Sequence, residues 1–231
     1  MIKKRGVQIV FLLFFCFSLL AQNETDSLTV NFHLKFGKFP LELNKYYISA
    51  SKDTLSISKF KCYISNIKIH YLDNSSYIQK DSYHLLDFDN PNTFQIPICK
   101  KSFKTISKVT FDIGIDSLIN TAGAMAGDLD PIKGMYWAWQ SGYINMKIEG
   151  KSSSCKTRKN EFQFHIGGYL KPYYAMRKVE IVNNDNMNIN LILDLKYFFD
   201  KFSLSDTNSV MIPGKLAMEL ANDSVKMFRL E

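Results

Sequence analysis

Apolar and polar residues alternate along the first long ordered segment of the sequence. In "LTVNFHLKFG", the apolar positions from Leu28 to Phe36 alternate with Thr29, Asn31, His33 and Lys35. A period of two residues is typical of a strand with one face against a core and the other toward solvent. The pattern predicts a half-buried strand that ends at Gly37.

The same alternation recurs in several later segments and predicts an all-β protein. They are "FKCYISNIKIHYL", "YHLLDF", "KVTFDIGI", "YINMKIEG" and "EFQFHIGG". A polar loop, "KSSSCKTRKN", predicts a hairpin between the last two, and "KVEIVNN" with "MNINLILDL" predicts a second hairpin around residues 183–186. Many short strands with turn signals between them favour an antiparallel β-sandwich.

Two segments near the end of the chain have helical spacing instead. Positions 195, 198, 199 and 202 are apolar at i, i+3, i+4 and i+7, after Asp194 as an N-cap, and "GKLAMELAND" predicts a second short helix. The expected fold is therefore an antiparallel β-sandwich with one or two short C-terminal helices. Without repeats, low-complexity tracts or linkers, it forms one domain over residues 22–231.

The start of the chain has the pattern of a secretory signal peptide over residues 1–21. Lys3, Lys4 and Arg5 precede an uncharged apolar run over residues 7–20, and the small residue Ala21 follows it. This run is too short for a convincing transmembrane helix, and no later segment could span a membrane. Cys16 follows a phenylalanine where a lipoprotein signal needs a small residue, which argues against lipidation. We expect an exported protein.

Composition excludes several classes of function. The formal net charge of +7 falls to +4 without the three basic residues of the signal peptide, and no basic run is interleaved with aromatic residues. Neither feature supports nucleic-acid binding. The chain carries no GxSxG, HExxH, P-loop or GxGxxG motif, so we expect no enzyme. Asp128 and Asp130 indicate a structured turn rather than a calcium site.

The cysteines leave two alternatives open. Export would remove Cys16 and keep Cys62, Cys99 and Cys155, with no CxxC pair and so no zinc signature. An oxidising compartment permits one disulfide, which leaves one thiol over, or all three are small buried thiols.

Two histidines fall on the polar face of their predicted strands. His33 lies opposite the apolar set of the first strand, and His165 lies opposite Phe162, Phe164 and Ile166. Imidazoles suit copper or zinc, and two that converge would begin a metal site. A surface role without metal is the alternative, because spacing does not show which strands are neighbours. His70 and His84 flank a polar turn and are expected at the surface.

Both tryptophans lie in one short segment, "GMYWAWQSGY". In an extended conformation Met135, Trp137 and Trp139 would share one face, which would place a thioether beside two indoles. Thioether and imidazole ligands both suit Cu(I), whereas simple packing at a strand entry is the alternative.

The motifs together resemble a known family. "YISNI", "FDIGID", "GDLDP", "GMYWAWQSGY", "KIEG" and "FHIGG" occur in this order and are similar to those of the MbnP-like family of small exported β-sandwich proteins. The resemblance implies a copper site that includes histidines and a kynurenine, made from a tryptophan by a partner di-haem enzyme of the MauG type. Carried over to this chain, it implies His33, His165 and either Trp139 or Trp137, with Trp139 slightly preferred.

The sequence therefore predicts an exported copper-binding protein for acquisition or handling of copper in the periplasm or at the cell surface of a Gram-negative bacterium. The alternative is a β-sandwich interaction module without metal that binds a protein or a glycan. Convergence of His33 and His165 beside a tryptophan would favour the first function.

Overall fold

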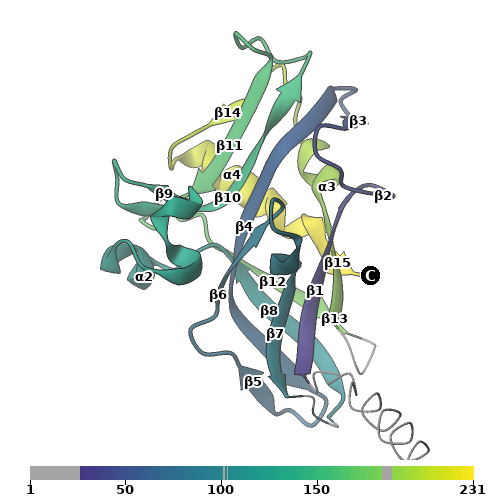
Figure 1. Ribbon diagram of the computed structural model, residues 1–231, viewed down its shortest axis with the longest axis vertical. Helices are drawn as coiled ribbons and strands as arrows, with labels where there is room; N and C mark the ends of the chain where they lie inside the picture. Colours follow the sequence, from purple (N-terminus) through teal and green to yellow (C-terminus); the bar gives the residue numbers. More distant parts are fainter. Residues whose placement is uncertain (1–26, 101, 103, 184–188) are drawn as a thin grey trace, which may run out of the picture.

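The computed structural model describes residues 27–100, 102, 104–183 and 189–231. Two sheets pack face to face (Figure 1). Sheet A has the order β15–β13–β1–β2, from Phe228–Leu230, Ile189–Asp194, Ser27–Phe36 and Phe39–Pro40, and β7 (Gln95–Lys100) also pairs with β1. The predicted signal peptide over residues 1–21 and its cleavage site lie outside the described residues.

Sheet B is the larger sheet and carries most of the long strands. Its order is β12–β8–β4–β10–β11–β14, from Arg177–Val182, Ile106–Ile113, Thr54–Tyr71, Gly142–Ser152, Glu161–Gly167 and Ser209–Val210. Short strands extend it: β3 (Tyr46–Ile48), β5 (Ser76–Ile78) and β6 (Tyr83–Asp87) pair with β4, and β9 (Tyr136–Trp137) pairs with β10. The β-sandwich expected from the sequence is confirmed.

Alternation fixes which side chains form the core between the sheets. In β1, the positions from Leu28 to Phe36 that were predicted to face inward are buried, and the intervening ones are more exposed. Phe32 of sheet A meets Phe111 of sheet B edge to face, with ring centroids 5.7 Å apart. The inner faces of the two sheets therefore contact each other directly, and their outer faces point in opposite directions.

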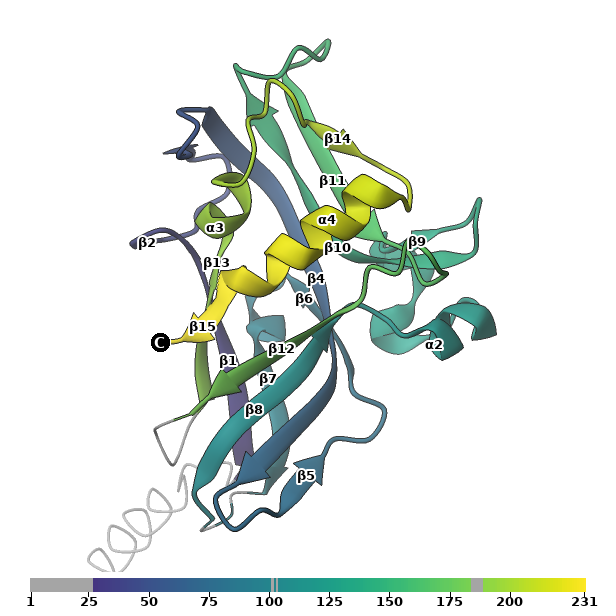
Figure 2. The same ribbon diagram turned by 180° about the vertical axis from the view of Figure 1, so that it is seen from behind.

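Helices close the core where sheet A does not cover sheet B. Helix α3 (Leu195–Phe199) begins at Asp194, whose carboxylate accepts a hydrogen bond from the Lys196 amide at 3.0 Å, as predicted. Helix α4 (Lys215–Ser224) lies over β11 and buries Ala217, Leu220 and Ala221 (Figure 2). The two short C-terminal helices are confirmed. No helix among the described residues is long and apolar enough to cross a membrane.

One predicted hairpin is wrong. β12 pairs with β8 in sheet B, whereas β13 pairs with β1 and β15 in sheet A, so the chain crosses between sheets here. The predicted turn begins at Asn183, and residues 184–188 lie outside the described part of the chain. The pairing of β13 with β1 is parallel, and so is that of β14 with β11. Burial alternates along β12 as predicted, but alternation carries no information about the partner strand.

A second, smaller core covers the outer face of sheet B. It is built from Tyr63, Leu85, Ile115, Leu129, Met135, Trp137, Tyr143 and Ile144. The segment that follows β8 folds over it as α2 (Ser117–Ala122) and the 3-10 turns η2 (Gly127–Leu129) and η3 (Pro131–Lys133). Asp128 and Asp130 belong to this layer: Asp128 pairs with Lys133 at 2.5 Å, and Asp130 caps η3. The structured turn predicted here is confirmed.

Candidate functional site

Trp137 is fixed on the outer face of sheet B by a close approach to Gly167. It lies in β9, opposite Gly142 of β10, and only 6% of its surface is exposed. A Cβ atom at Gly167 would lie 2.7 Å from Cζ3 of Trp137, closer than real contacts allow. Only glycine fits at position 167, because the indole of Trp137 occupies the space that a side chain would need.

Trp139 lies beside Trp137 but in a different environment. The chain turns after Trp137, which places Trp139 between β9 and β10 with 63% of its surface exposed. The ring centroids of the two indoles are 6.0 Å apart and their planes are inclined by 50°. The extended segment with Met135, Trp137 and Trp139 on one face is therefore wrong: Met135 and Trp137 are buried, and the turn places Trp139 at the surface.

His165 lies on the same outer face of sheet B as Gly167, the residue against which Trp137 packs. Residues 165 and 167 share one face of β11 because strand side chains alternate. The imidazole is buried, and its Nε2 atom lies 2.7 Å from Oε1 of Glu149. This hydrogen bond lowers the pKa of the Glu149 carboxyl, although burial acts in the opposite direction. The result is an oriented imidazole whose near neighbour is a carboxylate.

Two lysines tie the tryptophan segment to sheet B. The ammonium of Lys147, directly opposite His165 in the β10–β11 register, donates to the carbonyl of Gly134. Lys61 donates to the carbonyl of Lys133 at 3.1 Å and pairs with Asp87 at 2.7 Å. Burial lowers the pKa of Lys147. Both ammonium groups hold the end of η3, and so the entry to β9, against the sheet.

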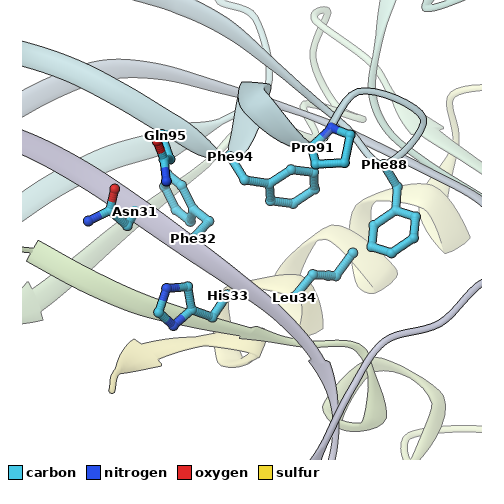
Figure 3. A pocket seen from close by; sticks show the side chains of 8 residues that line it. All are labelled: Asn31, Phe32, His33, Leu34, Phe88, Pro91, Phe94 and Gln95. Carbon is cyan, nitrogen blue, oxygen red and sulfur yellow. The ribbon is translucent and has the colours of Figure 1, made fainter.

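His33 occupies the outer face of sheet A. Its Nδ1 atom lies 2.7 Å from Oε2 of Glu231, whose other oxygen is 3.2 Å from Lys35. The hydrogen bond from His33 is the main reason why the pKa of Glu231 is lowered. A pocket of about 260 Å³ is lined by His33 and its neighbours on β1: Leu34 lies on the same side of the strand as Phe94 and Pro91, and His33 lies on the other side (Figure 3).

The structure does not bring the two predicted histidines together. Each histidine projects from the face of its strand opposite the residues of the main core, as expected. However, β1 and β11 belong to different sheets whose inner faces meet. His33 and His165 therefore lie on opposite outer faces of the sandwich, and the predicted convergence on one metal ion is wrong. Within the described ranges, no group of three or more His, Cys, Asp or Glu side chains is placed to hold a metal.

The remaining candidates take structural roles. Cys62, Cys99 and Cys155 are all free thiols, which corresponds to the alternative without a disulfide, and burial raises the pKa of Cys62. His70 and His84 are half-buried rather than fully at the surface, and burial lowers the pKa of both. Sequence reasoning missed Glu149 and Lys147, which alternation places on the outer face but cannot assign to His165 without the strand register.

The chain is a two-sheet β-sandwich with a second core on the outer face of its larger sheet, and Trp137 belongs to that second core. The MbnP family model matches residues 25–212. The chain belongs to the MbnP family. Its fold is similar to that of MbnP from Methylosinus trichosporium, with a TM-score of 0.60 and 14% sequence identity over 82% of each chain. No curated protein matches the sequence.

Proposed function

We propose that the chain is an exported copper-binding protein, without a catalytic role, that handles copper in the periplasm or at the surface of a Gram-negative cell. The observation that carries the proposal is the position of His165 on the same outer face of sheet B as the two tryptophans. Membership of the MbnP family and the signal-peptide pattern of residues 1–21 support it.

The imidazole of His165 fits a copper ligand. Copper accepts imidazole nitrogen readily, and a carboxylate that holds the other ring nitrogen orients the ring and increases its basicity. Glu149 holds Nε2, so Nδ1 is the nitrogen left for a metal. One imidazole is too few for a copper site, however. A further donor is required on this face.

An oxidised tryptophan would supply that donor. Kynurenine carries an aniline nitrogen and a ketone in place of the indole ring, and both can coordinate a metal. Trp139 is the better candidate because its ring is 63% exposed, whereas Trp137 is 6% exposed and held against Gly167. A di-haem enzyme of the MauG type is the proposed partner, and it could contact Trp139 without any unfolding of this chain.

His33 is assigned no part in this site. It lies on the outer face of sheet A, and its imidazole is engaged by Glu231. Because each histidine has one carboxylate partner at 2.7 Å, the two provide a matched pair for mutagenesis.

The test is a copper titration of mature protein coexpressed with a di-haem MauG-type enzyme from the same bacterium. Cu(I) affinity is measured against a competing chelator for the wild type, His165→Ala and His33→Ala. We expect His165→Ala to weaken binding at least about tenfold, because an imidazole ligand is lost, and His33→Ala to leave it unchanged. Equal affinity of His165→Ala and the wild type would refute the ligand assignment.

Peptide mass spectrometry tests the modification separately. We expect loss of one carbon and gain of one oxygen on the peptide that contains Trp139, and no such change in a Trp139→Phe variant. Trp137→Phe should still be modified. Modification confined to Trp137 would contradict the argument from exposure.

Export is tested by N-terminal sequencing of the secreted form. We expect the mature chain to begin near Gln22 or Asn23, after the small residue at the end of the apolar run. A secreted form that begins with Met1 would contradict the signal-peptide interpretation.

A further inference from the structure

A second feature lies far from the tryptophans, at the end of the sandwich where β2, β3 and α3 lie beside one another (Figure 1). An open groove of about 530 Å³ is formed there between the two sheets' short edge strands. Its base includes the stacked rings of Phe36 and Tyr47, with centroids 4.6 Å apart. The volume falls within the range of small-molecule sites, about 300–1,000 Å³, whereas the pockets beside His33 and Tyr169 are about 260 and 190 Å³.

The groove's apolar side chains are unusually exposed. Phe39, Tyr46 and Ile48 all line it, and 63%, 72% and 64% of their respective surfaces are open to solvent. Exposed apolar side chains that cluster around one concavity indicate a binding surface, whereas scattered ones are common on any protein. Folding does not require them there, because none of the three belongs to either hydrophobic core.

Every charged side chain that lines the groove is a lysine. They are Lys38, Lys45 and Lys196. Lys45 is paired with Glu42 at 2.6 Å and Lys196 with Asp200 at 2.6 Å, and neither of these carboxylates lines the groove. Among the described residues, no ion pair involves Lys38, which is exposed at the turn before β2. The groove therefore offers an apolar surface with an available cation at its edge.

We propose that this groove binds an amphipathic monoanion: a free carboxylic acid with a long apolar chain. The chain would lie on Phe36, Tyr47 and Ile48, and the carboxylate would lie at Lys38. The proposal does not depend on copper binding, because the groove shares no residue with the tryptophan face of sheet B.

The test uses dodecanoate below its micelle concentration and isothermal titration calorimetry of the mature chain. We expect saturable binding of one molecule per chain. A series from octanoate to dodecanoate should show affinity that rises by about twofold to fourfold per methylene, the upper value being that of a fully buried methylene. Dodecanol, which has the tail without the charge, should bind about fivefold more weakly, as expected for loss of an exposed ion pair. Acetate, which has the charge without the tail, should show no measurable binding.

Two substitutions locate the site, and one controls for nonspecific effects. Ile48→Glu should abolish dodecanoate binding, and Lys38→Glu should weaken it by about fivefold, as expected for an exposed ion pair. Ile78→Glu is the matched control. Ile78 is 59% exposed and is the last residue of β5, and Ile48 is the last residue of β3; both are three-residue strands that pair with β4. All three positions are exposed, so thermal unfolding should show that each variant folds.

Several outcomes would overturn the proposal. They are no saturable binding of dodecanoate, equal binding by the Ile48→Glu and Ile78→Glu variants, or equal affinity for dodecanol and dodecanoate. Binding to anionic phospholipid vesicles without binding of monomeric dodecanoate would also overturn it and would assign the groove to a membrane surface. Copper affinity measured on the Ile48→Glu variant should equal that of the wild type, so failure here is distinct from failure of the copper proposal.

Discussion

Gly167 provides a direct test of how the tryptophan segment is held on sheet B. In Gly167→Ala, the new Cβ would lie 2.7 Å from Cζ3 of Trp137 and 2.7 Å from the carbonyl oxygen of Tyr143. One of these neighbours is backbone in a paired strand, so the indole is the group that must move. Overpacking of this size costs about 1–3 kcal/mol. For a chain of this length, that corresponds to a fall in Tm of roughly 3–10 °C.

The assay combines thermal unfolding with tryptophan fluorescence. In a Trp139→Phe background Trp137 is the only tryptophan left, because the chain contains two. Gly167→Ala should then shift its emission to longer wavelength, since the indole is displaced from a site where it is 6% exposed. Gly214→Ser is the control, because its Cβ would meet nothing within 4 Å and serine is a good N-cap for α4. Unchanged Tm and unchanged emission in Gly167→Ala would refute the close packing of Trp137 on β11.

Two further predictions concern stability, and a third concerns the cysteines. The pKa of Glu149 is lowered in the folded protein, so its stabilising effect is present above its ordinary value of 4.5 and is lost as the pH falls through the lower folded value. The Tm advantage of the wild type over Glu149→Gln should therefore shrink as the pH falls below about 4.5, and a constant difference would contradict this. Asp194→Ala should lower the free energy of unfolding by about 3 kcal/mol, because the buried carboxylate caps α3 and pairs with Arg229 at 3.0 Å. Chemical denaturation measures this loss, and a value below about 1 kcal/mol would contradict the prediction. Finally, the denatured mature chain should titrate three thiols without reductant, and a lower count would indicate a disulfide.

Much of the fold follows from local patterns in the sequence. Alternation in β1 identified the buried positions, because a strand with one face on a core must place every second side chain inward. In β10 and β11 it identified the face that meets the main core, but Tyr143, Asn145 and His165 on the opposite face are buried as well. Asp194 identified the start of α3 because its side chain can accept from an amide that has no partner within the helix. The family motifs include Trp137, Trp139 and His165; in the structure the two indoles lie 6.0 Å apart, and Trp137 packs against Gly167, which shares one face of β11 with His165.

The partners of each strand were decided only by the tertiary structure. Alternation correctly placed His33 and His165 on the side of their strands opposite the main core. It does not show on which sheet each strand lies, and two sheets packed face to face have two outer faces. The same gap explains the wrong hairpin, since β12 and β13 are consecutive in sequence yet pair in different sheets. It also explains why Trp139 is exposed beside a buried Trp137: the turn after β9 is set by pairing with β10, a contact that local periodicity does not encode. Hydrophobic periodicity reports how each strand meets the core, whereas the meeting of distant side chains depends on register and layer, which arise only when the whole chain packs.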